Sequence, residues 1–254
     1  MKSCNQCVSN LFPCTILVVN LSANLSSLHN PIPYFLPTTN IKEVRNVLLV
    51  NGEYEMDTYT VFPNPTINKK GIISNSFINL KITNFWDACA YVHEIPYGYN
   101  STSNDILILF KEGYGSCTTK HAVIATLAEE LDIAVHKMIG IYAMSEDIVT
   151  GTNLILDKYH LPYLPMIHCF LIYDSYHVDL TEGNNNGKNH SIEEFLFTEK
   201  VIPNFCEKDE YLLYKKALKN NILIRKEMEG ITMIDVLHAR TEGISLLRSK
   251  VSYQ

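Results

Sequence analysis

A short segment of the chain places a thiol and an imidazole at the start of an amphipathic stretch. Residues 115–121 read Gly-Ser-Cys-Thr-Thr-Lys-His. Because Ser116 is a good helix N-cap, Cys117 would lie on the first helical turn, where free N–H groups and the positive end of the helix dipole favour a thiolate. Cys117 is therefore a candidate nucleophile. The same thiol could instead be a small buried apolar group, or a zinc ligand together with His121 one turn later.

A cysteine nucleophile needs an imidazole that exchanges its proton and a third group that orients the imidazole. Two strand-like segments, residues 167–173 and 176–180, flank a candidate two-residue turn; a three-residue loop would instead put the side chains considered below on opposite faces. If the residues next to the turn pair, the alternation of side chains places His168 and Asp179 on one face as diagonal neighbours, with Cβ atoms about 7 Å apart or less. The pattern therefore predicts a carboxylate within reach of the imidazole.

Two neighbours of this pair have other expected roles. His177 lies on the same face as Asp179, two residues away on the same strand, so it is a rival base. Cys169 points away from His168 because side chains alternate along a strand, and we expect it to pack in the core.

Three segments together resemble the transglutaminase-like cysteine-protease superfamily. They are residues 115–122 (Gly-Ser-Cys-Thr-Thr-Lys-His-Ala), residues 168–171 (His-Cys-Phe-Leu) and residues 179–181 (Asp-Leu-Thr). The first segment is the most specific, and the resemblance extends roughly over residues 80–250. It implies a papain-like α+β core in which a helix bearing the nucleophile packs on an antiparallel sheet.

The resemblance also implies an activity. Cys117 would be the nucleophile, His168 the general base and then acid, and Asp179 the group that orients the histidine. The protein would be a cysteine-dependent hydrolase or acyltransferase that cleaves an amide or related acyl bond through a thioester, without a cofactor or a metal. Its substrate would be a peptide, a protein or a small amide. The oxyanion donors would be the Cys117 N–H and a side chain of the upstream loop, Asn100 or Tyr99.

Two other functional classes remain open at this point. One is a binding module that keeps the fold without the activity. The other is a zinc protein that uses Cys117 and His121. The N-terminal thiols could also hold a metal, but no fourth ligand follows at zinc-finger spacing, so we interpret them as incidental; they are Cys4, Cys7 and Cys14.

The flanking sequence predicts the elements that position these residues. Apolar residues recur at helical spacing over 82–92, followed by a polar loop over 96–104 and the helix that begins after Ser116. Residues 134–144 read as a strand that precedes the predicted hairpin, and the chain is mainly helical from Glu207 onward. Another strand and turn are expected over 45–52. The order indicates an α+β domain with additional C-terminal helices.

Composition limits the partners and the compartment. The chain has 254 residues, an apolar fraction of 46% and a formal net charge of −6. Its lysines and arginines are scattered, and no apolar run approaches the ~18–20 residues that span a bilayer, so we expect a soluble protein without a nucleic-acid or membrane partner. Seven cysteines form no disulfide framework, which is typical of a reduced, cytoplasmic protein. A short apolar stretch at 11–19 leaves secretion as the alternative, and nothing in the sequence predicts the oligomeric state.

The expected domain organisation is simple. Residues 1–40 are rich in Ser, Asn and Pro without sustained periodicity, which predicts a poorly ordered leader. Residues 41–254 contain no internal repeat or linker, so they are predicted to form a single transglutaminase-like domain.

Overall fold

The computed structural model of the chain describes residues 48–50, 53–55 and 58–251. Residues Val47–Gln254 form one compact unit. The predicted leader lies outside the described residues, and so do its three cysteines and the first part of the strand expected over 45–50. The described end of that strand, β1 (Leu48–Val50), pairs antiparallel with β2 (Glu53–Glu55).

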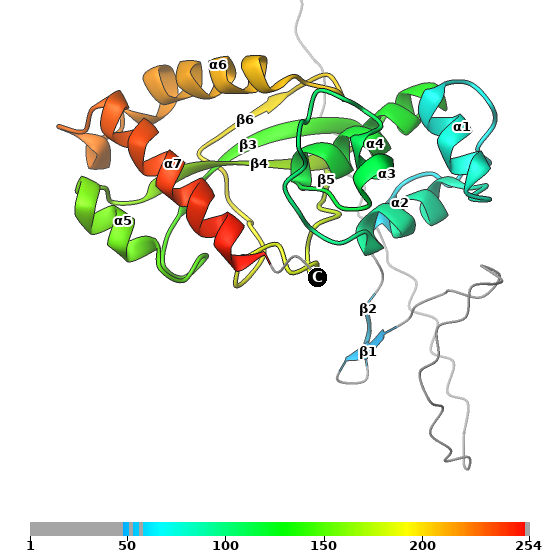
Figure 1. Cartoon of the computed structure of the whole chain (residues 1–254), viewed down its shortest axis with the longest axis horizontal. Coiled ribbons are helices and arrows are strands. Elements are labelled where there is room, and N and C mark those ends of the chain that lie inside the picture. Colours follow the sequence, from blue (N-terminus) through cyan, green and yellow to red (C-terminus); the bar gives the residue numbers. More distant parts are fainter. Residues whose placement is uncertain (1–47, 51–52, 56–57, 252–254) are drawn as a thin grey trace, which may run out of the picture. The chain divides into compact units, whose positions relative to one another are not determined.

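The fold is α+β, as predicted, with an antiparallel sheet of four strands in the order β5-β4-β3-β6 (Figure 1). The two central strands, β3 and β4, pair over all of β3, from His136 with Ile172 to Met144 with Leu164. The bounds of the strands are β3 His136–Met144, β4 Leu164–Tyr173, β5 Tyr176–Val178 and β6 Phe197–Lys200.

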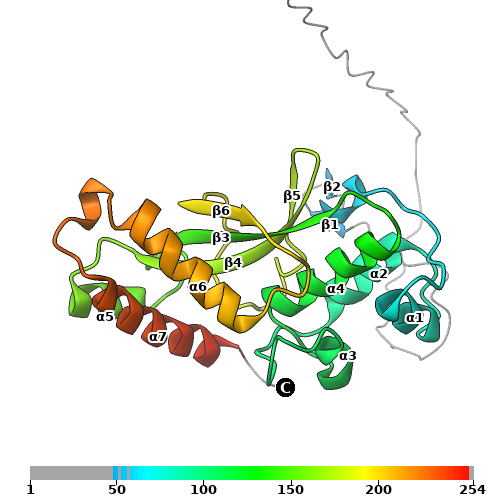
Figure 2. The ribbon, with the colours of Figure 1, turned by 90° about the horizontal axis from the view of Figure 1, so that it is seen from above.

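Seven α-helices lie in the described part of the chain. Helices α1–α4 gather toward one end of β3 and β4, and α5–α7 toward the other, as Figures 1 and 2 show. The bounds are α1 Ile72–Asn79, α2 Phe85–Glu94, α3 Ile108–Glu112, α4 Cys117–Glu130, α5 Thr152–Tyr159, α6 Glu207–Ala217 and α7 Met233–Lys250.

The helix expected over residues 82–92 is α2, which begins three residues later than its apolar pattern. Asn84 is its N-cap, and the side-chain oxygen of Asn84 accepts the N–H of Asp87 at 2.9 Å. This cap provides a partner for an N–H group that has no acceptor within the helix. The cap therefore sets the first residue of α2 and leaves buried Ile82 in the preceding turn.

The predicted hairpin has the predicted turn. Tyr173 pairs with Tyr176, so the loop consists of Asp174 and Ser175. Asp174 has a φ of 51°, the left-handed conformation that two-residue hairpin turns need and that Asp tolerates better than most residues. The pairing ends at Val178, so β5 is only three residues long.

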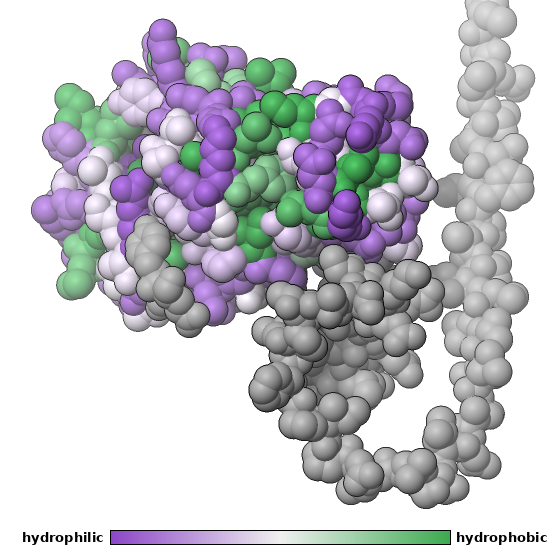
Figure 3. Space-filling view, turned by 45° about the vertical axis from the view of Figure 1, so that its right-hand side comes forward, coloured by the Kyte–Doolittle hydropathy of each residue, from purple (hydrophilic) through white to green (hydrophobic). Residues whose placement is uncertain are grey.

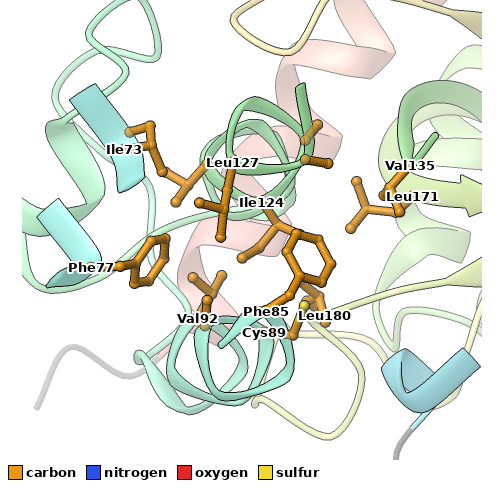
Figure 4. Close-up of a cluster of buried hydrophobic side chains, with 14 of the residues drawn as sticks. Ile73, Phe77, Phe85, Cys89, Val92, Ile124, Leu127, Val135, Leu171 and Leu180 are labelled. Carbon is orange, nitrogen blue, oxygen red and sulfur yellow. The ribbon is translucent and has the colours of Figure 1, made fainter. Parts of the chain in front are cut away.

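The core on one side of α4 fixes the helix that carries the thiol. Ile124 and Leu127 of α4 are fully buried against Phe77 of α1, Phe85 of α2 and Leu171 of β4, and Figure 4 shows these side chains meeting. Burying one such side chain stabilises a fold by roughly 1.5–3 kcal/mol. The position of Cys117 is therefore set by a packed interior rather than by a surface loop.

Helix α7 approaches β4 closely at a glycine. A Cβ atom on Gly243 would lie 2.6 Å from Leu164 Cδ2, so a larger residue would force the Leu164 side chain to shift. The close contact brings the next turns of α7 beside the middle of β4, where His168 lies.

None of the described helices combines the length and the apolar composition needed to cross a lipid bilayer. On the face drawn in Figure 3, hydrophilic residues occur in several separate groups among hydrophobic ones.

Candidate active site

Cys117 is the first residue of α4. Ser116 occupies the N-cap position with extended backbone angles, as predicted, and its N–H is accepted by the Thr119 hydroxyl at 3.1 Å. Cys117 has an exposed fraction of 8% and lines a cavity of about 210 Å³. The thiol is therefore sheltered from bulk water but open to a small reactant.

The backbone before Cys117 is held against the loop that follows α2. The N–H of Gly115 donates to Pro96 O at 3.0 Å, and Gly115 O accepts the N–H of Gly98 at 3.1 Å. A Cβ atom on Gly115 would overlap the side chains of Leu109 and Thr119, so a larger residue here would displace them. The pairing brings Tyr97 to the wall of the cavity.

His168 and Asp179 are in direct contact. His168 Nε2 lies 2.6 Å from Asp179 Oδ2, and both side chains are largely buried. The hydroxyl and the N–H of Thr181 both donate to Asp179 Oδ1, at 2.7 and 2.8 Å. The expected ladder pair between Phe170 and Asp179 does not form, because the chain leaves the sheet after β5. The turn at Thr181 holds the carboxylate in place instead.

Thiol, imidazole and carboxylate influence one another's pKa. Burial and the Lys188 charge lower the pKa of His168, but the charges of Asp179 and Cys117 outweigh them and raise it to about 9. Burial raises the pKa of Asp179, yet the positive charge of His168 holds it well below its usual range. At neutral pH these directions favour an imidazolium between a thiolate and a carboxylate.

The pKa of Cys117 lies well below the usual range of a thiol. A hydrogen bond from the Cys169 thiol lowers it most, burial opposes this effect, and the charge and hydrogen bond of His168 lower it further. Because Nε2 of His168 faces Asp179, Nδ1 is the ring atom left for the Cys117 sulfur. A lowered thiol pKa and an imidazole partner are the properties of reactive cysteines.

Cys169 packs in the core, as predicted, and it does so beside the thiol of Cys117. It is fully buried, and it shares a hydrophobic cluster with Cys117 and hydrogen-bonds to that thiol. The Thr118 hydroxyl lies 3.7 Å from its sulfur. Side chains alternate along β4, so Cys169 points away from His168. Cys169 nevertheless lies beside Cys117, because the first turn of α4 meets β4 at this point.

His121 ties α4 to the end of the hairpin. Its Nδ1 donates to Cys117 O at 2.8 Å, and its Nε2 accepts the N–H of Leu180 at 2.9 Å and lies 3.3 Å from Asp179 Oδ1. The lone pair that a metal would need is therefore used by the backbone. Within residues 58–251, no three metal-ligating side chains are grouped around an ion site. This arrangement does not fit the zinc alternative.

Two buried lysines that the sequence reading did not single out fix the backbone near the thiol. Lys120 donates to His93 O and Ile95 O, and burial lowers its pKa to about 7. Lys137 of β3 donates to Thr118 O at 2.9 Å and to Pro203 O at 3.1 Å. Lys120 thereby links α4 to the end of α2, and Lys137 links α4 to the segment that follows β6.

The two predicted oxyanion donors both line the cavity, but Asn100 has no N–H to offer. Its amide donates to Glu112 Oε2 at 2.9 Å and to Tyr114 O at 2.7 Å, and its oxygen accepts the Thr119 hydroxyl. Asn100 therefore holds the loop to α4. Tyr99 packs edge-to-face on Tyr97.

Tyr142 is a further polar group of the cavity that the sequence reading missed. It lies on β3 beside His168, with ring centroids 6.5 Å apart. Its hydroxyl is buried and has no hydrogen-bond partner among the described residues, although the side chain lines the cavity. Burial raises its pKa, so the hydroxyl keeps its proton and can donate it. A buried donor without an acceptor calls for an explanation.

His177 lies outside this arrangement. It is exposed on β5, and its ring packs on Phe170 with centroids 4.8 Å apart. Asp179 contacts His168 and His121 instead.

Comparison of the chain with protein-family models, with curated proteins and with solved structures gives no match. The resemblance to the transglutaminase-like superfamily therefore rests on the three sequence segments alone and stays a prediction.

Proposed function

We propose that this protein is a cysteine-dependent hydrolase or acyltransferase that cleaves an amide or related acyl bond. The observation that carries the proposal is the contact of 2.6 Å between His168 Nε2 and Asp179 Oδ2, made by an imidazole whose charge also lowers the pKa of Cys117. A nucleophile, a base and a group that orients the base, joined in this order at a cavity, form the arrangement required for acyl transfer.

In the first half of the proposed reaction, the Cys117 thiolate attacks the carbonyl carbon of the substrate. The oxygen of the tetrahedral intermediate is stabilised by the Cys117 N–H, which has no acceptor within the helix, and by the Tyr142 hydroxyl. The His168 imidazolium then gives its proton to the leaving amine as the C–N bond breaks. The product is a thioester on Cys117.

In the second half, His168 is neutral and acts as a base. It takes a proton from water or from an acceptor amine, which attacks the thioester carbon and releases Cys117 as a thiolate. Asp179 keeps the imidazole oriented and stabilises its charge when it is protonated. Cys117, His168 and Asp179 would act in the same way whether water or an amine attacks the thioester, so the proposal covers both hydrolysis and transfer.

The finer fold assignment is also a proposal. Helix α4, which begins at the thiol, packs on β4, which carries the histidine, and the aspartate follows the next strand. This order along the chain, cysteine then histidine then aspartate, is the order that the transglutaminase-like superfamily implies. It supports a transglutaminase-like core with α5–α7 as additions.

The pH dependence of acylation separates the two roles of His168. We expect acetylation of Cys117 by 4-nitroacetanilide to fall about tenfold per pH unit above pH about 9, because the imidazolium that protonates the amine is then lost. Acetylation by p-nitrophenyl acetate should not fall, because its leaving phenolate needs no proton. Mass spectrometry of the intact protein measures both rates.

Parallel profiles for the amide and the ester would contradict the role of His168 as general acid. If neither the two acyl donors nor iodoacetamide modifies Cys117 at neutral pH, the result would instead favour a binding module that keeps the fold without the activity.

A further inference from the structure

The cavity in front of Cys117 has one strongly basic wall. Lys188 follows the Asp179 turn, and Arg240 and Arg248 lie eight residues apart on α7, so the two arginines fall on neighbouring parts of one helix face. Ile244 and Leu247, between them on α7, line the same cavity. We call Lys188, Arg240 and Arg248 the basic wall.

The basic wall makes no direct ion pair in the described part of the chain, although the charge of Arg240 acts on Glu210. Within residues 58–251, no carboxylate forms an ion pair with any of the three side chains. The Nε atom of Arg240 is buried and has no hydrogen-bond partner in the same part of the chain. Such a donor destabilises the fold unless a ligand accepts from it.

Aromatic rings hold both guanidinium groups in place. Arg240 lies over the ring of Tyr214 at 4.8 Å, and Arg248 lies over the ring of Tyr99 at 5.0 Å. Stacking of this kind fixes a guanidinium without satisfying its N–H groups. The two arginines are therefore positioned but still able to bind an anion through paired hydrogen bonds.

The acidic residues of the cavity do not cancel this wall. Glu207 of α6 accepts the N–H of Ser103 at 2.8 Å, and the hydroxyls of Thr102 and Ser103 lie within reach of the same oxygen, so it caps the loop before α3. Burial raises the pKa of Glu210, and the Cys117 charge acts in the same direction, although the charges of Lys137 and Arg240 oppose them. The Lys188 charge, in contrast, acts on the reactive groups, because it lowers the pKa of both Cys117 and His168.

We propose that the acyl donor of this site carries a carboxylate close to the reacting carbonyl group, and that Arg240 and Arg248, assisted by Lys188, bind this carboxylate. The proposal rests on the proposed function, because it names the substrate class of the same cavity. Arginine matches a carboxylate through two parallel N–H···O bonds, and a positive wall also raises the local concentration of anionic substrates.

The test compares two alkylating reagents that differ in one charge. Iodoacetate and iodoacetamide both form a bond between the Cys117 sulfur and a methylene carbon as iodide leaves, but only iodoacetate has a carboxylate next to that carbon. The measured quantity is the ratio of their rates at Cys117, by peptide mass spectrometry. We expect Arg240→Gln and Arg248→Gln each to lower this ratio by about tenfold, with the iodoacetamide rate unchanged.

Lys219→Gln is the control, because it removes an exposed positive charge that does not line the cavity and should leave the ratio unchanged. Arg248 is exposed, so its variant should fold even if Arg240→Gln does not. A ratio equal in wild type and both arginine variants would overturn the carboxylate proposal and leave the proposed function intact. A Cys117 inert to both reagents would instead remove the proposed function itself.

Discussion

Replacing His168 by alanine is expected to lower the rate at which 4-nitroacetanilide acetylates Cys117 by at least ~10²-fold, the lower end of what general acid–base catalysis contributes. The reason is electrostatic as well as chemical. His168 is buried between Asp179 and Cys117, and its charge helps to hold the thiol as a thiolate at neutral pH. The variant loses the group that exchanges the proton and also part of the nucleophile's ionisation.

His177→Ala is the matched control for this variant. It also removes an imidazole, but one that lies on the neighbouring strand, nine residues further along the chain. The His177 ring is exposed and packs on Phe170. We expect a small effect on acetylation, because His177 does not contact Asp179 in the described structure. A larger loss in His177→Ala than in His168→Ala would move the base to His177 and undo the proposed mechanism.

Tyr142→Phe should lower the same acetylation rate by ~10²–10³-fold, the usual cost of removing one oxyanion donor. The change deletes only the hydroxyl, whose oxygen is buried without a partner among the described residues. Alkylation by iodoacetamide passes through no oxyanion, so its rate at Cys117 should stay unchanged. The comparison thus separates a donor to the intermediate from a residue that merely supports the site.

The outcome that would contradict the role of Tyr142 is an unchanged acetylation rate in a folded variant. Loss of both acetylation and alkylation would indicate that the hydroxyl supports the geometry around Cys117 rather than the intermediate. Stability is not expected to fall, because the hydroxyl has no described hydrogen bond to lose.

Local rules were sufficient for the elements around the site. The N-cap at Ser116 and the two-residue turn follow from neighbouring residues, and both are present. The parity of the hairpin then predicted that His168 and Asp179 would meet. The length of β5 could not be predicted in the same way, because the strand ends where the turn at Thr181 offers the Asp179 carboxylate better partners than the sheet does. Helix α5 was also missed, since it is only eight residues long.

The rest of the cavity depends on long-range packing that periodicity does not encode. Tyr142 and Cys169 look like ordinary core residues of β3 and β4, and only the position of α4 brings them to the thiol. Arg240 and Arg248 look like the solvated face of a helix until Gly243 lets α7 approach β4. Asn100 was placed correctly at the cavity, but its donors serve Glu112 and Tyr114, neighbours that the sequence alone did not reveal.

The central claim is that Cys117 is an activated nucleophile. The most direct measurement is brief, substoichiometric alkylation at pH 7, followed by mass-spectrometric mapping of the modified cysteine. We predict that Cys117 is modified ahead of the more exposed Cys206, because the lowered pKa of Cys117 makes it a thiolate at this pH. Protection of Cys117 under conditions that label buried Cys89 or Cys169 would contradict the claim.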